Sequence, residues 1–171
     1  NEDAGWVEEV QPLPANGVLY VDDGEVTLKG ILKGQLTIGA DENIRITDDV
    51  TYSDNPRNNA DSTDILGIIA GQNVIVDRDA PRNVDIEASI IALNRSFGVE
   101  GWWVGPARGT LGVYGGIIQA NRGIVGRFNS RTGRPLSGYK KQYRYDDRLR
   151  TLAPPFFPTT GEYDALLWQE Q

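Results

Sequence analysis

Carboxylates gather in four short segments of this sequence, together with residues that favour turns. Clustered carboxylate oxygens are the ligands that calcium prefers, and Asp, Asn and Gly are also typical turn residues. None of the segments follows the twelve-residue calcium loop or a glycine-aspartate nonapeptide repeat. Solvated turn acids are therefore the main interpretation, and calcium stays a candidate ligand without an assigned site. The segments are Asp22–Glu25, Asp41–Asn43, Asp48–Asp49 and Asp77–Asp79.

Most other catalytic chemistry is excluded by composition. The 171 residues include no His, no Cys and no Met, which removes imidazole and thiol catalysis, disulfides and the usual zinc sites. Two carboxylates about 5 to 10 Å apart would serve a glycosidase. Such a pair needs a groove built by long loops, and the sequence before residue 100 contains one long polar loop. We therefore predict a protein that is not an enzyme.

An aromatic doublet, Trp102–Trp103, stands between glycines and precedes Pro106. Neighbouring side chains of an extended segment point to opposite faces, so at least one ring is expected to face outward. An exposed indole would bind sugars, polymers or partner proteins. Alternatively, the loop folds back and the rings cover the core. The residues alone leave both interpretations open.

The segment 122–150 combines nine bases with two acids and several aromatic rings. This composition is typical of a nucleic-acid surface, because cations follow the phosphates and rings stack on the bases. Two other interpretations stay open: internal ion pairs that cap the fold, and head-to-tail contact with the acidic half of another copy, which would continue into a filament. The candidate interaction residues are Trp102, Trp103, Arg122, Arg127, Arg131, Arg134, Lys140, Lys141 and Arg144.

Charge is divided unevenly along the chain. The net charge of −7 is made up of −12 over residues 1–90 and +5 over residues 91–171. If chain order corresponds to position along an axis, the fold has an acidic end and a basic end. The chain has no apolar run of 18 residues, so no membrane span is predicted. The lack of any Met predicts a processed product or a fragment of a longer chain.

The elements that must position these residues are short strands. Apolar residues recur two apart, and side chains two apart share one face of a strand. Polar residues mostly separate them in the first half, which indicates one buried face. Continuous apolar runs occur at 18–21, 65–70 and 90–93. The pairs are Val26/Leu28, Leu36/Ile38, Ile44/Ile46, Val50/Tyr52, Val74/Val76, Val84/Ile86, Phe97/Val99 and Leu111/Val113.

Short strands with glycine-rich turns fit two all-β arrangements, a sandwich and a solenoid. Strands this short favour the solenoid, in which parallel neighbours supply the backbone hydrogen bonds. Loops are predicted at 53–64, 77–83 and 128–138, with little or no helix. We predict an irregular single-chain β-solenoid (β-helix) with side loops and a capped C-terminal end. It comprises a lead-in over 1–16, a core over 17–126, and a basic loop with a Pro/aromatic segment over 127–171 that packs on the core.

Several runs resemble the C-terminal region of a bacterial family of uncharacterised function, over about residues 16–170. The most specific are LGIIAG (Leu66–Gly71), ALNRSFGVE (Ala92–Glu100), and YRYDDRLR (Tyr143–Arg150) followed by PPFFPTTGEY (Pro154–Tyr163). Members of that family usually carry a type IV pilus assembly or minor-pilin-like N-terminal segment. The resemblance implies an exported, β-solenoid-like surface module near pilus machinery, active in adhesion or DNA capture. This sequence departs from the pilin layout because it has no apolar N-terminal helix.

The expected function is therefore that of an extracellular structural or adhesive module on a bacterial surface, pilus-associated or filament-forming. Its partners would be other copies of itself or other surface and pilus proteins. The alternative is a surface receptor that binds DNA along 122–150 or polysaccharide at Trp102 and Trp103.

Overall fold

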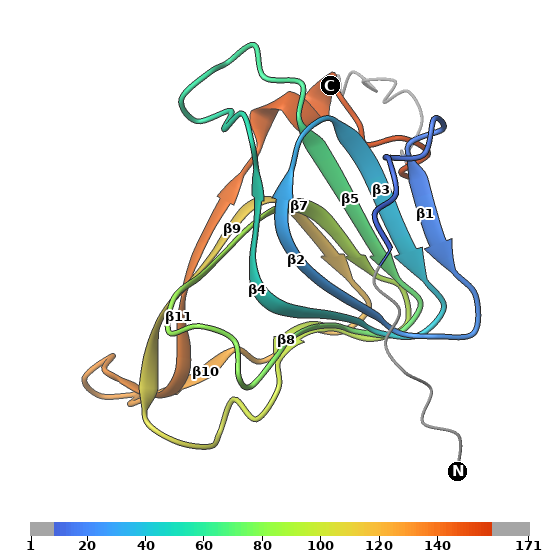
Figure 1. Cartoon of the computed structure of the whole chain (residues 1–171). Coiled ribbons are helices and arrows are strands. Elements are labelled where there is room, and N and C mark those ends of the chain that lie inside the picture. Colours follow the sequence, from blue (N-terminus) through green and yellow to red (C-terminus); the bar gives the residue numbers. More distant parts are fainter. Residues whose placement is uncertain (1–8, 159–171) are drawn as a thin grey trace, which may run out of the picture.

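The computed structural model describes residues 9–158 (Figure 1). Predictions that concern residues 1–8 and 159–171 lie outside this range. Within it, η1 is a single turn of 3₁₀ helix, and no helix is long and apolar enough to cross a bilayer. The elements are β1 (Val18–Val21), β2 (Val26–Leu32), β3 (Gln35–Ala40), β4 (Ile44–Tyr52), β5 (Ile65–Ala70), β6 (Val74–Val76), β7 (Val84–Ala92), β8 (Phe97–Val99), β9 (Ala107–Gln119), β10 (Gly126–Phe128), β11 (Pro135–Tyr145) and η1 (Asp147–Arg150).

All eleven strands belong to one mostly parallel sheet. β1, β3, β5 and β7 follow one another as parallel neighbours, and β4, β6 and β8 form a second parallel series. β2 joins β4, while β9 lies between β7 and β11. Among the described strands, only β10 and β11 pair in antiparallel fashion. The predicted all-β class with almost no helix is confirmed, and the pairing differs from the antiparallel hairpins that a sandwich would need.

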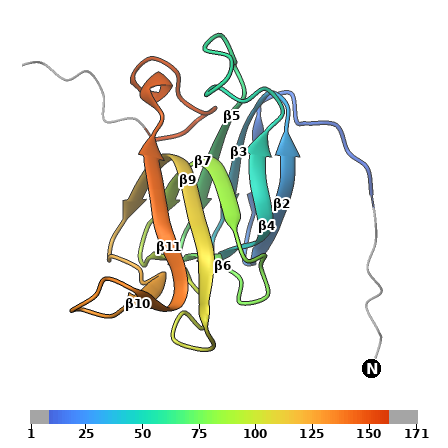
Figure 2. The ribbon, with the colours of Figure 1, turned by 90° about the vertical axis from the view of Figure 1, so that its left-hand side faces the viewer.

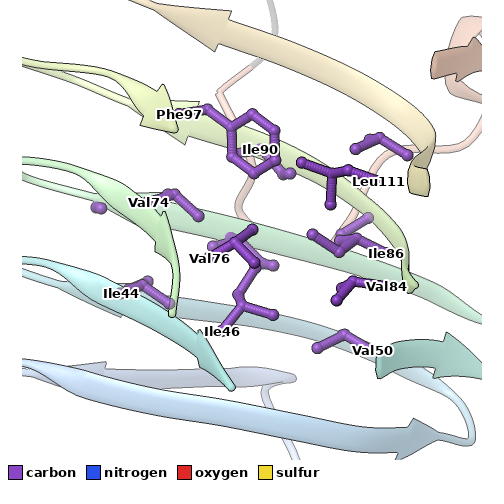
Figure 3. Close-up of a cluster of buried hydrophobic side chains, with 14 of the residues drawn as sticks. Ile44, Ile46, Val50, Val74, Val76, Val84, Ile86, Ile90, Phe97 and Leu111 are labelled. Atoms are coloured by element: carbon purple, nitrogen blue, oxygen red, sulfur yellow. The ribbon is translucent and has the colours of Figure 1, made fainter. Parts of the chain in front are cut away.

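The apolar pairs form the interior, as the two-residue period predicts. Ile44 and Ile46 of β4 are fully buried. Their register partners on the neighbouring strand β6 are Val74 and Val76, which are also buried. Figure 3 shows these side chains gathered in one interior together with those of β7, β8 and β9. The apolar side chains of neighbouring strands thus lie side by side and shield one another from water. This burial stabilises the fold by roughly 25 cal/mol per Å² of apolar surface removed from water.

In one part of the sheet, neighbouring strands are arranged in the same order as they occur in the sequence. Figure 2 shows β2, β4, β7, β9 and β11 side by side, with β2 at one edge and β11 at the other. The acidic turn before β2 and the bases of β11 therefore lie at opposite edges. The sheet also extends through β11, beyond the boundary predicted at residue 126.

The loops largely agree with the prediction, and the C-terminal segment lies over the outside of the sheet. The loops predicted at 53–64 and 77–83 are confirmed, whereas the third predicted loop is shorter because β11 already begins at Pro135. The C-terminal segment 152–158 crosses β3 and β5, where the hydroxyl of Thr37 donates to the carbonyl of Pro155. Gly67 leaves space on β5 for the ring of Phe157. The described part of the Pro/aromatic segment therefore packs on the sheet.

Candidate functional site

A groove of about 430 Å³ lies over β6, β8 and the turn that follows β8. Its floor includes Ile75 and Gly98, which are register partners in the parallel β6–β8 pair. Their chain neighbours point into the core, so residues 75 and 98 face the other way. Because Gly98 has no side chain, the backbone of Gly123 and Ile124 packs closely over this position, where a Cβ atom would lie 3.3 Å from the Ile124 carbonyl oxygen. Polar atoms of Asn73 and Ser96 line the rim.

The two tryptophans form one wall of the groove. Gly101 and Gly105 adopt positive φ angles of 61° and 76°, and the N–H of Val104 donates to the carbonyl of Gly101 at 2.8 Å. This tight turn places the rings of Trp102 and Trp103 edge to face, with centroids 5.4 Å apart. Trp102 packs against the core, whereas Trp103 is 58% exposed. One ring therefore packs on the core and the other faces outward, and ligand binding at the outward ring stays a prediction.

The carboxylate in the groove is already paired. Glu100 accepts a hydrogen bond from Arg45 at 2.8 Å, and Arg45 also contacts Asp77 at 3.0 Å. Burial lowers the pKa of Arg45, but the hydrogen bond that Arg45 donates to Asp77 and the negative charge of Glu100 raise it by more. Arg78 lies 3.9 Å from Glu100 as well, so two cations accompany the two carboxylates and Glu100 is paired with cations.

Arg122 joins the groove to a second cavity of about 400 Å³. The second cavity is lined by Phe97, Lys141 and Tyr143 as well as by Arg122. Burial lowers the pKa of Lys141, and the nearby positive charge of Arg122 lowers it further. Burial also raises the pKa of the Tyr143 hydroxyl. Two cations and two aromatic rings therefore meet beside the tryptophan groove.

The other predicted bases lie elsewhere. Arg127 is an exposed residue of β10, and Arg131 and Arg134 are exposed in the connection between β10 and β11. Lys140 is exposed on β11. Arg144 lines a separate cavity of about 220 Å³. The structure thus places Arg122 with Trp102 and Trp103 in one cavity and with Lys141 in the adjoining one, and it distributes the remaining bases over other surfaces.

Sequence reasoning missed a buried carboxylate, Glu87. It accepts hydrogen bonds at 2.7 Å from the Tyr52 N–H and from the Asn55 amide, and it pairs with Arg57. The guanidinium of Arg57 also lies over the ring of Tyr114. Glu87 thereby holds the loop 53–64 against β7. Its one sequence signal is a carboxylate between the apolar residues Ile86 and Ala88.

A second missed contact fixes the same loop to the C-terminal turn. Arg148 pairs with Asp146 at 2.7 Å and donates to the carbonyls of Ser62 and Asp64. Burial lowers the pKa of Arg148, but the hydrogen bond and charge of Asp146 raise it by more. Ion pairing inside the basic segment, one of the predicted alternatives, is therefore present at this pair.

The predicted acidic turns do not converge. Among residues 9–158, no three carboxylates are grouped as metal ligands would be. Asp41 instead accepts hydrogen bonds from the Tyr20 hydroxyl and the Asp23 N–H, and these bonds lower its pKa. Calcium binding stays a prediction without a site.

Comparison with protein-family models, with curated proteins and with solved structures finds no match. The resemblance to pilus-associated proteins therefore stays a prediction, and the function is argued below from the geometry of the groove.

Proposed function

We propose that this chain is a non-enzymatic structural and adhesive module of a bacterial cell surface, built as an irregular β-solenoid. The parallel pairings support repeated coils, because strands pair with neighbours that follow one coil later. The turns between strands are also stacked on one another. Asn73, in the turn before β6, donates hydrogen bonds to the side chain of Asn43, 30 residues earlier, and its side chain accepts one from the N–H of Ser96, 23 residues later. The unequal spacing agrees with coils interrupted by side loops. The pilus association rests on the sequence resemblance.

The adhesive surface that we propose is the groove at Trp102 and Trp103, and its ligand is a polysaccharide. The observation that carries this proposal is the exposed ring of Trp103 held edge to face by the half-buried Trp102. A sugar ring has an apolar face and polar edges. It would stack on the indole while the hydroxyl of Ser96, which also lines the groove, offers a hydrogen bond.

DNA is less well supported as the ligand. A DNA-binding surface needs several cations that follow the phosphates. In this fold the bases of segment 122–150 are distributed over β10, β11, η1 and the connections between them, Arg148 pairs with Asp146, and Arg144 lines a cavity that also contains Asp85 and Glu87. A strand of DNA would therefore meet cations at Arg122 and Lys141 without a continuous basic track through the groove.

Replacing Trp103 with alanine is expected to weaken polysaccharide binding by about thirtyfold, since an aromatic anchor at an interface typically contributes 2 kcal/mol or more. Binding is measured by isothermal titration calorimetry with soluble polysaccharides, because the variant lacks the indole whose fluorescence would report binding. The matched control is Tyr20→Ala, which removes a ring that is 61% exposed at the far edge of the sheet. Equal affinity of Trp103→Ala and the unchanged protein, or no binding of any polymer, would contradict the proposal.

Self-assembly is a second candidate function, supported by unpaired strand edges. Among the described strands, β1 pairs with β3 alone and β2 with β4 alone. The apolar side chains of Leu19 and Ile31 on these edge strands are 47% and 76% exposed. Another copy could extend the sheet here by bringing its basic β10–β11 region to this edge, where the acidic turn Asp22–Glu25 lies.

If the module forms filaments, its hydrodynamic size should grow with protein concentration and decrease as salt screens the end-to-end attraction. Light scattering measures this size. Changing Arg127, Arg131 and Arg134 to Glu should abolish the growth, whereas Lys29→Glu, which adds negative charge to the acidic end, should preserve it. A size that does not depend on concentration excludes this candidate.

A further inference from the structure

We infer that the polysaccharide bound at the tryptophan groove is acidic, and that Arg122 and Lys141 bind a carboxylate of a uronic acid unit next to the unit stacked on Trp103. This inference rests on the proposed function and specifies its ligand. The two cavities share Arg122 and Gly123, so these residues form the boundary between them, and a polymer that contacts both cavities would pass over Arg122.

The charges around the second cavity are unbalanced. The lowered pKa of Lys141 reflects burial and the nearness of Arg122. No carboxylate lines this cavity among residues 9–158, where its remaining lining is Phe97, Ile117, Gln119, Gly123 and Tyr143. The described salt bridges also leave Arg122 and Lys141 without an acidic partner. An incoming carboxylate would relieve the repulsion between the two cations and accept charge-assisted hydrogen bonds from both.

The position of these cations follows from the register of the sheet. Lys141 pairs with Leu111 and Tyr143 pairs with Val113, and both partners are buried core residues. The side chains of Lys141 and Tyr143 therefore point to the interior side of β11. Because β11 is the last strand in the series β2, β4, β7, β9 and β11, the interior opens to solvent beside it. Phe97 and Tyr143 lie edge to face with centroids 6.1 Å apart. They give the cavity an apolar floor, and the ammonium of Lys141 lies 5.6 Å from the Tyr143 ring centre.

This arrangement suits a sugar acid better than a free inorganic anion. The apolar floor would contact the carbon face of a pyranose ring, while the guanidinium of Arg122 matches the two oxygens of a carboxylate. Trp103 then binds the neighbouring unit in the groove. The ligand class is thus a polymer that contains uronic acids.

The test measures binding of the full chain to immobilised polygalacturonate, alginate and hyaluronate, each beside a counterpart whose carboxylates have been reduced to alcohols. At low salt, we expect at least one uronate polymer to bind about tenfold more tightly than its reduced counterpart. Arg122→Gln and Lys141→Gln should remove this difference and preserve binding of the reduced polymer. Lys140→Gln is the matched control, because its side chain points to the opposite face of β11 and should leave the preference intact.

The outcomes separate the two proposals. Equal binding of uronate and reduced polymers by the unchanged protein overturns the acidic-ligand inference and keeps the polysaccharide groove. Loss of both forms in Trp103→Ala, with the preference lost in Lys141→Gln, supports both proposals. No binding to any polymer refutes the proposed function and the inference together. Tighter binding of single-stranded DNA than of every uronate, with the same dependence on Lys141, overturns the inference in favour of nucleic acid.

The pH dependence adds a readout that a structural role of Lys141 would not produce. Its lowered pKa means that Lys141 loses its charge at a lower pH than an ordinary lysine does. The titratable groups that face it are Arg122, which stays charged, and Tyr143, whose raised pKa keeps it neutral. The preference for uronate should therefore decline as the pH rises through the pKa of Lys141. Lys141→Arg should keep the preference over this range, and a pH-independent preference in the unchanged protein would contradict the assigned role.

Discussion

Replacing Glu87 with alanine is expected to lower the free energy of unfolding by about 3 kcal/mol, near the lower end of the cost of removing one partner of a buried ion pair. The side chain of Glu87 is 1% exposed, and the change leaves the buried N–H of Tyr52 and the amide of Asn55 without their acceptor. The estimate is at the lower end because Arg57 is 39% exposed and can turn toward water. Urea unfolding followed by circular dichroism measures the difference.

Two controls separate the role of Glu87 from a general effect of losing a charge on β7. Asp85 lies two residues earlier on the same face and is exposed, so Asp85→Ala should change stability by no more than about 0.5 kcal/mol. Trypsin cleavage after Arg57 should become faster in Glu87→Ala, because the loop 53–64 loses its attachment to the sheet. Equal unfolding midpoints for the two variants, with unchanged cleavage, would show that Glu87 does not hold this loop.

The strands could be predicted because their signal is local. Ile44 and Ile46 face the interior and Arg45 between them does not, which is the alternation that the sequence displays. The partner of each strand is not encoded in this pattern, since any apolar pair matches any other. The register of β4 with β6 also depends on polar contacts between turns, such as the one between Asn43 and Asn73.

β11 could not be predicted from hydrophobic periodicity, because it ends the stack of strands. Its interior-facing positions hold Lys141 and Tyr143, where the register partners on β9 are Leu111 and Val113. At this last level the interior opens to solvent, so long amphipathic side chains replace aliphatic ones. The sequence therefore reads as a basic surface, although the backbone continues the parallel sheet.

The candidate site was predictable in part. The glycines around Trp102 and Trp103 indicate a turn with one outward ring, and the structure places Trp103 there. The approach of Arg122 and Lys141 to this turn depends on how β8, β9 and β11 assemble, which no local pattern encodes. For the same reason, the loop containing Arg57 was visible in the sequence, but its attachment to Glu87 was not.

We expect a large loss of stability when Gly115 is replaced with alanine, although this change adds only one methyl group. It is the last β9 residue that pairs with β11, and it also pairs with Ala88 of β7. Its φ of 154° disfavours residues with a side chain, and a Cβ atom here would lie 1.9 Å from the carbonyl oxygen of Ala88. Relief requires β7 and β9 to move apart, so Gly115→Ala should lower the free energy of unfolding by about 3 kcal/mol or more.

The neighbouring glycine provides a matched control for this prediction. A Cβ atom at Gly116 would meet only the Leu149 side chain, at an ordinary 3.7 Å. Gly116→Ala should therefore be neutral, or stabilising by about 0.5 kcal/mol, because alanine restricts the unfolded chain. Thermal and urea unfolding of both variants measure the contrast. Similar stabilities of the two variants would mean that Ala88 of β7 does not lie against Gly115 of β9. The parallel register of β7, β9 and β11, on which the β11 cavity depends, would then have to be revised.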